Sequence, residues 1–327
     1  MMRLLITGAS GFLGRNALLA IPSSWQVAAL YRSGNSGFLS FVEDHQLRHV
    51  QPVACDLTDV RQVERALSQV GRDFDCCLAL ASNTSIPGSI ERPIDDLTTN
   101  AIGLLHLLQS CSLDHLVYLS SGTVYIGLTG LVGPDSAVSP TLPYAISKVA
   151  AEQYIRAFAN YRQTPRHATI VRFFGAYGPY EPSRKLYTKL VRQFAFKRDP
   201  HFTVIGDGKD YIDAMYVDDA IRALLAVLAL PPSEGVRCID LGAGSGESVN
   251  SVVTRAAHIF GLEPQIIHEG SPPSYIQFVI DPYPFTATYQ FTPAVSLEEG
   301  LKRLATHLEQ EDYNRREILS PEETRQI

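Results

Sequence analysis

The chain has 327 residues, of which 45% are hydrophobic and 19% are charged, and its formal net charge is −6. This length corresponds to about two domains, and the composition is that of a globular rather than a disordered protein. The acidic balance argues against nucleic acid as a partner, and no apolar run reaches the ~20 residues that a membrane span needs. The N-terminus lacks the long apolar region of a secretory signal, so we expect a cytoplasmic protein.

The cysteines are odd in number and form no CxxC pair; they are Cys55, Cys76, Cys77, Cys111 and Cys238. Disulfide frameworks and zinc sites use paired cysteines at characteristic spacings. We therefore expect reduced thiols in the core and no metal.

Up to about residue 174, short apolar runs alternate with amphipathic stretches. The expected strands are Arg3–Thr7, Gln26–Tyr31, His49–Ala54, Phe74–Ala81, His115–Ser120 and Ala168–Phe173. The expected helices between them include Asp59–Val70, Ile94–Ser112 and Tyr144–Tyr161. Continuous apolar runs are typical of parallel strands buried on both faces, and their alternation with helices predicts an α/β fold. The specific expectation is a Rossmann-type doubly wound parallel sheet over residues 1–174.

Beyond residue 174 frequent prolines separate shorter elements. The expected helices there are Val217–Leu230, Val249–Phe260 and Ser296–Glu309. This pattern indicates a smaller C-terminal α/β lobe over residues 175–310 that binds substrate, with some segments returning to the first domain. Residues 311–327 are expected to be a charged tail that frays.

A glycine-rich turn follows the first expected strand, with the sequence Gly8-Ala9-Ser10-Gly11-Phe12-Leu13-Gly14. In such a turn the first glycine allows a tight bend, the second lets the backbone approach a pyrophosphate, and the third lets the helix pack on the strand. The N-terminus of the following helix then offers free N–H groups to the phosphates. The position of the turn on the first strand predicts a dinucleotide site.

Two further strand ends bear on the cofactor. The second strand ends in Tyr31-Arg32-Ser33 without an acidic residue, and a planar guanidinium suits a 2′-phosphate, so we expect NADP rather than NAD. Arg32 could instead be a solvated charge or stack on adenine. After the third strand, Asp56 and Leu57 precede Thr58, and Asp56 either accepts from the adenine amino group or, like Thr58, caps the next helix.

A catalytic constellation is indicated by Tyr144-Ala145-Ile146-Ser147-Lys148. At the start of a helix this spacing puts Tyr144 and Lys148 one turn apart on one face. A neighbouring ammonium stabilises phenolate, so Tyr144 could exchange a proton with a substrate hydroxyl while hydride moves. Upstream, a strand ends in Ser120-Ser121-Gly122-Thr123, and a hydroxyl there can hydrogen-bond the same substrate oxygen.

These motifs, in this order and spacing, resemble the extended short-chain dehydrogenases/reductases of the NAD-dependent epimerase/dehydratase family, which act mainly on nucleotide sugars. The matching segments are TGASGFLG at 7–14, CDLTD at 55–59, LALAS at 78–82, NAIG at 100–103, YLSSGTVY at 118–125, PYAISK at 143–148, VRFFGAYGP at 171–179 and VIGDGKDYIDAMYVDD at 204–219. The resemblance implies a domain that holds NADP or NAD and a lobe that holds a nucleotide sugar. It also implies a homodimer in which helices 94–112 and 144–161 form a four-helix bundle.

The resemblance also assigns residues. Ser121, Tyr144 and Lys148 match the family's catalytic residues, and Lys148 would also bond the nicotinamide ribose. It further places the cofactor beside Leu57, Leu80, Ala81, Ser82 and Asn100, although a buried capping role remains an alternative for Asn100. Asn83 and Thr84 follow the fourth strand and could contact the sugar or simply form a turn.

The chain departs from the family pattern at several positions. Gly122 and Thr123 stand where sugar dehydratases carry an acidic pair or Ser-Glu, which argues against dehydratase and decarboxylase activity. Gly175 stands where the family often has asparagine, and Ile212 where an arginine usually clamps the diphosphate. Other cations would then have to bind the diphosphate; the candidates are Arg184, Lys185 and Lys189, with Arg192 a turn further, although a solvated helix face is the alternative.

A competing motif is the segment Cys238–Glu247, which resembles the glycine-rich motif of a class I methyltransferase. Such a motif should open its own domain of well over a hundred residues, and too few residues follow it here. The favoured hypothesis is an NAD(P)-dependent nucleotide-sugar epimerase acting by transient oxidation at carbon 4. The alternatives are an NADPH-dependent 4-ketosugar-nucleotide reductase, an enzyme on a non-nucleotide substrate and a non-catalytic dinucleotide-binding protein.

Overall fold

The central feature of the computed structural model, which describes residues 1–34, 37–272 and 275–318, is a parallel seven-stranded sheet. Its strand order is β12-β7-β5-β4-β1-β2-β3. The strands are β1 (Arg3–Thr7), β2 (Gln26–Tyr31), β3 (Val50–Ala54), β4 (Asp73–Ala79), β5 (Ser112–Ser121), β7 (His167–Phe173) and β12 (Val236–Leu241). The predicted α/β class and doubly wound sheet are thus confirmed, and the order reverses beside β1, where such sheets bind their ligands.

Helices cover both faces of this sheet. One face packs on α1 (Phe12–Ala20), α2 (Gly37–Asp44) and α9 (Val217–Ala229); the other packs on α3 (Val60–Val70), α6 (Gly103–Ser110) and α7 (Pro143–Arg162). The alternation of β1 explains the arrangement, because Leu4 and Ile6 join the first core whereas Leu5 joins the second. Every one of these side chains is 0% exposed, so the strand is buried on both sides.

The helix expected over Ile94–Ser112 is present as one continuous helical run that contains a π-helical turn. It consists of α5 (Pro93–Leu97), the π-helical turn (Thr98–Ile102) and α6, and a short helix α4 (Ile86–Glu91) precedes it. Ser112 already belongs to β5. π-helical turns of this kind commonly occur at functional sites, and this one carries Asn100.

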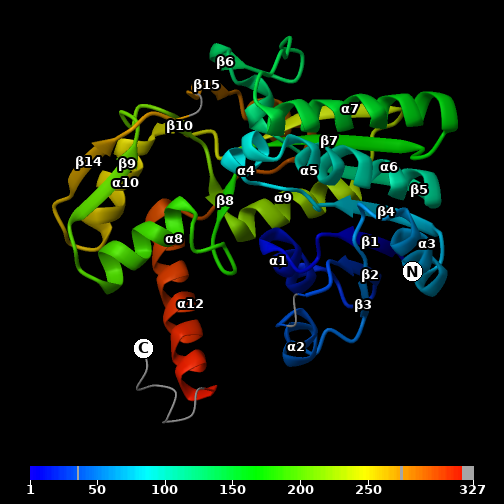
Figure 1. Cartoon of the computed structure of the whole chain (residues 1–327), viewed down its shortest axis with the longest axis horizontal. Coiled ribbons are helices and arrows are strands. Elements are labelled where there is room, and N and C mark those ends of the chain that lie inside the picture. The colour runs from blue at the N-terminus through cyan, green and yellow to red at the C-terminus, as the bar shows by residue number, and fades with distance from the viewer. Residues whose placement is uncertain (35–36, 273–274, 319–327) are drawn as a thin grey trace.

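The C-terminal lobe lies to the left of the sheet in Figure 1. Its helical elements are α8 (Leu186–Val191), a π-helical turn (Arg192–Phe196), α10 (Val249–Ile259) and α12 (Leu297–Ile318), while α11 (Tyr283–Tyr289) contacts β12 and α9. The remaining strands pair two by two: β9 (His201–Ile205) with β14 (Gln265–Glu269), β10 (Tyr211–Ile212) with β13 (Glu247–Ser248), β8 (Ala176–Tyr177) with β11 (Met215–Tyr216), and β6 (Thr129–Val132) with β15 (Gln277–Ile280). A 3-10 turn (Gly122–Tyr125) follows β5.

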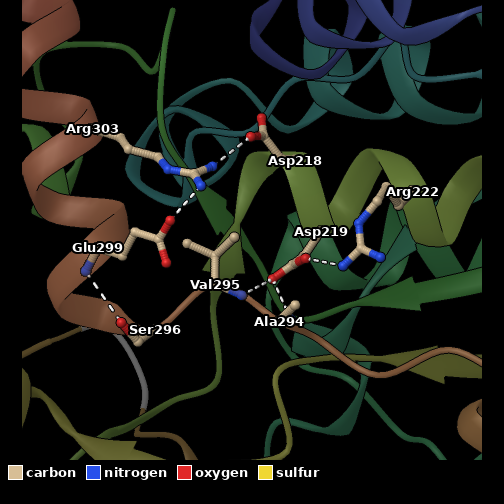
Figure 2. A network of polar contacts seen from close by, with 8 residues as sticks. All are labelled: Asp218, Asp219, Arg222, Ala294, Val295, Ser296, Glu299 and Arg303. Carbon is tan, nitrogen blue, oxygen red and sulfur yellow. Dashed lines mark hydrogen bonds and ion pairs between the residues drawn. The ribbon is translucent and has the colours of Figure 1, made fainter.

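The start of α9 holds the chain that leads into α12 (Figure 2). Asp219 is fully buried and accepts hydrogen bonds from the backbone N–H groups of Ala294, at 2.9 Å, and Val295, at 2.8 Å. Beside it Asp218 pairs with Arg303 of α12 at 3.1 Å. These contacts fix the C-terminal helix against the element that packs under the main sheet.

The rejection of a separate methyltransferase-type domain at Cys238–Glu247 agrees with the structure, in which β12 is the edge strand of the main sheet beside β7. One expectation about the last helix was wrong. The last helix does not end at Glu309, because α12 continues through Ile318, past the start of the expected tail; residues 319–327 lie outside the described part of the chain. None of the helices in the described ranges combines the length and apolar character needed to cross a membrane.

Candidate active site

The glycine-rich turn connects β1 to α1, and its lack of side chains leaves the protein backbone accessible to a ligand. Gly8 has φ +68°, and a Cβ on it would lie 2.8 Å from the backbone nitrogen of Ala81. A Cβ on Gly14 would lie 2.4 Å from the carbonyl oxygen of Gly8. Gly11 caps α1 without a side-chain hydrogen bond, so the first N–H groups of the helix are not covered by a capping side chain. The turn, with Ser10, Phe12 and Leu13 in it, therefore fits the pyrophosphate of a dinucleotide.

The neighbouring strand ends lie beside this turn. The backbone N–H of Ala9 donates to Leu30 near the end of β2, and the N–H groups of Leu80 and Ala81 donate to the carbonyl and the hydroxyl of Thr7. Tyr31 ends β2, and Arg32 after it is exposed. The end of β2 and the segment after β4 thus flank the turn on both sides, as expected for a cofactor lying across β1.

The segment after β3 uses its polar groups locally. Asp56 accepts from the N–H of Thr58 at 3.0 Å and from its hydroxyl at 2.8 Å. The residue that caps α3 is Asp59, which accepts from the N–H of Arg61, so the expectation that Asp56 or Thr58 caps this helix was wrong. Leu57 packs against Gly103 of α6, where a Cβ would lie 3.1 Å from that of Leu57.

Ser121, Tyr144 and Lys148 come together at the carboxyl edge of the sheet. The Ser121 side chain hydrogen-bonds the phenol of Tyr144, and so does the side chain of Ser82. The ammonium of Lys148 donates to the carbonyl oxygen of Leu119 at 2.6 Å and to the Ser82 hydroxyl at 3.4 Å. The structure therefore brings the three residues expected to be catalytic into one cluster with Ser82.

Burial dominates the electrostatics of this cluster. Lys148 is 1% exposed, and desolvation lowers its pKa to about 7 against the opposing charges of Glu152 and Asp96. Burial also raises the pKa of Tyr144, while its hydrogen bonds from Ser121 and Ser82 lower it in part. A phenol in this setting loses its proton only with help from the adjacent ammonium, which is the arrangement that a switchable general acid and base needs.

Asn100 is buried at 1% exposure and engages the protein with both ends of its amide. Its oxygen accepts from the hydroxyl of Ser82 at 2.9 Å and from the N–H of Asn83 at 2.8 Å. Its nitrogen donates to Asp96 at 3.1 Å and to Ser147 at 3.0 Å. This geometry favours the structural alternative for Asn100, because the amide ties the loop after β4 to α7.

Known proteins resemble this chain over most of its length. The family model of the NAD dependent epimerase/dehydratase family matches residues 4–239. The chain belongs to this family. It is 22% identical over 312 residues to a putative UDP-glucose 4-epimerase of Methanocaldococcus jannaschii, covering 92% of this chain and 96% of that protein. It is 30% identical over 243 residues to dTDP-glucose 4,6-dehydratase of Xanthomonas campestris, covering 69% and 67%.

A further relative aligns with only about half of the chain. An uncharacterized UDP-glucose epimerase of Bacillus subtilis is 28% identical over 165 residues, which is 50% of this chain and 51% of that protein. Among solved structures, the UDP-glucuronic acid 4-epimerase of Bacillus cereus in complex with UDP-glucuronic acid and NAD superimposes with a TM-score of 0.83. That structure is 23% identical and covers 94% of this chain and 99% of its own, so it supports the fold.

Within this family fold, Gly122 lies directly under an aromatic ring. A Cβ on Gly122 would lie 2.8, 2.9 and 2.9 Å from three ring atoms of Phe174. The hydroxyl of the following residue, Thr123, donates to Ser121 at 3.0 Å. The position after Ser121 therefore has no space for the acidic side chain that a family dehydratase would carry there.

The other departures have local structural causes. Gly175 adopts φ +121°, which an asparagine would adopt only with strain, and a Cβ there would lie 3.4 Å from that of Ala214. Ile212 lies in β10, pairs with Glu247 of β13 and packs against the main core. Ile212 supplies no charge at the position of the usual arginine.

The four expected cations have separate surroundings. Arg184 is exposed and its guanidinium donates to the hydroxyl of Thr84 at 3.4 Å, which joins the C-terminal lobe to the loop after β4. Lys185 is half-buried at the start of α8, and burial, followed by the charge of Arg184, lowers its pKa. Lys189 is exposed on α8, whereas Arg192 pairs with Asp312 of α12 at 3.1 Å. Arg192 therefore binds another helix instead of extending the expected cationic cluster.

Sequence reasoning missed Asp96 and Ser147. Asp96 is 0% exposed and accepts from Ser147 at 2.7 Å, beneath the cluster around Tyr144. A signal was available, because Asp96 precedes Asn100 by four residues and so shares its helical face, while Ser147 lies within the Tyr144–Lys148 motif. Nothing in that spacing, however, shows which face of the segment turns inward.

Proposed function

We propose that the protein is an NAD(P)-dependent epimerase that inverts a nucleotide sugar at carbon 4 by transient oxidation. The observation that supports this most directly is the cluster of Ser121, Tyr144 and Lys148 beside a glycine turn that fits a dinucleotide. The named activity of the Methanocaldococcus jannaschii relative and the ligands named for the Bacillus cereus structure agree with it.

The roles of the side chains follow from their positions. A bound nicotinamide supplies hydride acceptance and return. Tyr144, as phenolate, removes the proton of the carbon-4 hydroxyl, and Ser121 hydrogen-bonds the same oxygen. Lys148, one helical turn after Tyr144, is the cation proposed to make phenolate accessible, and its hydrogen bond to the Leu119 carbonyl holds its ammonium in place. After the ketosugar turns its other face, Tyr144 returns the proton, so the reaction has no net redox change.

Gly122 supports epimerisation over dehydration. A dehydratase must also protonate a leaving hydroxyl and remove a carbon-bound proton, which needs further acids and bases next to Ser121. Phe174 fills the space where the first of these would lie, and Thr123 is neither an adequate acid nor an adequate base.

The direct test is incubation of the purified protein with UDP-glucose, UDP-glucuronic acid and dTDP-glucose, followed by chromatographic separation of the epimers. We expect interconversion of at least one carbon-4 pair, abolished in Tyr144→Phe. Formation of a 4-keto-6-deoxy product, or turnover that persists in Tyr144→Phe, would refute the proposal.

The alternative reaction is reduction of a 4-ketosugar nucleotide by free NADPH, and Arg32 is the feature that favours it. An exposed guanidinium at the end of β2, without a neighbouring acid, suits a 2′-phosphate, whereas the ligand named for the Bacillus cereus structure is NAD. Binding of NADH and NADPH to the protein and to Arg32→Ala separates the two cofactors. Loss of reduced-nicotinamide absorbance on adding a 4-ketosugar nucleotide would identify a reductase.

For the diphosphate, Arg184 and Lys185 are the proposed cations in place of Ile212. The bond from Arg184 to Thr84 brings its charge to the loop that follows β4, where the substrate would lie. The lowered pKa of Lys185 reflects burial beside a like charge, which an anionic ligand would relieve. Asn83 has a structural role through Asp96, so Thr84 is the better candidate for sugar contact.

A homodimer is the proposed assembly, supported by apolar side chains on the face formed by α4, α5 and α7. Ile94 is 77% exposed and Tyr161 is 88% exposed. The remaining members are Ile90, Leu97, Ile102, Ile146 and Tyr154, each between 37% and 49% exposed. These residues lie on α4, α5, the π-helical turn and α7, which contact one another, and exposed apolar side chains on adjacent helices are typical of a subunit interface. Light scattering should give two subunit masses, and Ile94→Glu should shift the mass to one; a monomeric wild type would contradict the assembly.

A further inference from the structure

Asp96 is a carboxylate that lies wholly inside the protein. It is 0% exposed, whereas its neighbour Asp95 on the same short helix has a side chain 68% exposed and pairs with Arg92 at 3.7 Å. An ionised carboxylate is costly to bury unless several donors compensate it. The groups that contact Asp96 therefore indicate the role of this buried carboxylate.

The donors to Asp96 come from three segments. One carboxylate oxygen accepts from the amide nitrogens of Asn83, at 2.8 Å, and Asn100, at 3.1 Å. The other accepts from the hydroxyl of Ser147 at 2.7 Å. These donors belong to the loop after β4, the π-helical turn and α7, so a single carboxylate holds all three together.

Each of these segments leads directly to the reactive cluster. Asn83 follows Ser82, whose hydroxyl accepts from Lys148 and whose side chain bonds Tyr144. Ser147 precedes Lys148 on α7, and its hydroxyl oxygen also lies 2.8 Å from the carbonyl oxygen of Tyr144. Asp96 is thus one residue removed from the groups that contact Lys148 and Tyr144.

The charge of Asp96 acts on the same groups. The ionisable groups whose charges act on Lys148 are Glu152 and Asp96. Tyr144 lies one turn before it on α7, and the ring centre of Tyr118 lies 4.6 Å from the ammonium. Glu152 forms an ion pair with Arg172 at 2.8 Å and accepts a hydrogen bond from the hydroxyl of Ser120 at 2.6 Å. The donors to Asp96 are neutral, so its negative charge is not offset by a paired cation among them.

We propose that Asp96 is a positioning residue of the active site, which holds Ser82 and α7 in register and supplies a negative charge that favours the ammonium form of Lys148. Its catalytic consequence rests on the proposed function. Its electrostatic consequence concerns Lys148 alone and is measurable without a substrate.

Asp96→Asn removes the charge and can keep the hydrogen bonds. The oxygen of the new side-chain amide would accept from the amides of Asn83 and Asn100, and its nitrogen would donate to the hydroxyl of Ser147. That hydroxyl can then give its proton to the carbonyl of Tyr144, which it already approaches. Asp95→Asn, on the same helix at the surface, is the matched control.

The measurement is the titration of Lys148 by carbon-13 lysine NMR of the full chain, with the signal assigned through Lys148→Met. We expect Asp96→Asn to lower the pKa of Lys148 by about one unit, because a nearby anion favours the charged form. Asp95→Asn should leave it unchanged. In the epimerase assay, kcat of Asp96→Asn should fall about tenfold at pH 8 and recover as the pH is lowered, with KM within about twofold.

A folded Asp96→Asn protein with an unchanged Lys148 titration would overturn the electrostatic part. If Asp96→Asn does not fold, the same titration is carried out on Asp96→Ser, whose side chain is smaller and also uncharged. Ser147→Ala tests the positioning part, since this substitution removes a donor to Asp96 and keeps the charge of Asp96. We expect kcat to fall about threefold, with the pKa of Lys148 near that of the wild type. An unchanged kcat would refute the positioning role. If no epimerase activity is found at all, the NMR titration still decides the electrostatic part.

Discussion

Replacing Gly122 with alanine should push the added methyl group into the ring of Phe174. Three ring atoms would lie 2.8, 2.9 and 2.9 Å from the new Cβ, whereas carbon atoms at their energy minimum are ~3.5–4.0 Å apart. The ring is hindered from moving away, because it packs 6.1 Å from the ring of Tyr125 and 6.1 Å from that of Phe278, centre to centre. Tyr125 and Phe278 are themselves 0% and 3% exposed.

The expected cost follows from two opposing effects. Overpacking of this kind costs about 1–3 kcal/mol. The loss of glycine's freedom in the unfolded chain offsets about 0.4–1 kcal/mol, because the φ of Gly122 is not in the left-handed region. The steric effect should win, leaving a net loss of about 1–2 kcal/mol in the free energy of unfolding. For a chain of this size, with an unfolding entropy of about 2.1 cal/mol/K per residue, the melting temperature should fall by about 1.5–3 °C.

The assay is a double-mutant cycle with Phe174→Leu, followed by thermal unfolding. Leucine lacks the ring atoms that meet the new methyl group, so Gly122→Ala should be nearly neutral or slightly stabilising in that background. An equal cost of Gly122→Ala with and without the ring would refute the steric reasoning. It would also remove the structural argument against an acidic residue at this position.

Three further outcomes are expected. Lys148→Met should abolish epimerisation but raise the free energy of unfolding by about 1–3 kcal/mol below pH 7, because a lysine whose pKa in the folded protein is about 7 must either lose its proton on folding or be buried charged. This gain in stability should shrink as the pH rises toward 10. A variant less stable than the wild type below pH 7 would contradict the prediction. Arg184→Ala should raise KM for the nucleotide sugar about tenfold with kcat little changed, whereas Lys189→Ala should change neither; equal effects of the two would disprove the assignment. Asp219→Ala should lower the free energy of unfolding by about 2–4 kcal/mol in chemical denaturation, since it leaves two buried backbone N–H groups without an acceptor, and a loss under 0.5 kcal/mol would count against the role of this carboxylate.

The sequence predicted the core of the fold because its signals are local. Strands such as Arg3–Thr7 and Gln26–Tyr31 were predicted to the residue, since a parallel strand buried on both faces reads as an unbroken apolar run between turns. Ser121, Tyr144 and Lys148 were recognised because their spacing carries the chemistry. What these residues contact, in contrast, depends on the packing of distant segments.

The misassigned residues show where local patterns stop being sufficient. Arg192 was expected to belong to a cationic cluster, but the position of α12 gives it Asp312 as a partner. The continuation of that helix past Glu309 was missed because its charged residues suggested solvent rather than contacts between helices. Asp96 was missed because one carboxylate in an amphipathic segment is ordinarily on the solvated face, and only the packing of α5 against α7 shows that this one faces inward.

The contacts between α9 and the entry to α12 have a consequence for the order in which the chain matures during synthesis. Asp219 is made well before Ala294 and Val295, whose backbone N–H groups it needs when buried. Until those residues leave the ribosome, the carboxylate has to stay hydrated and the start of α9 cannot close against its neighbours. The seven strands of the sheet, which end at Leu241, can assemble earlier. The C-terminal lobe is therefore expected to reach its native packing last, and a nascent chain stalled before residue 294 should have a formed sheet with this lobe not yet packed.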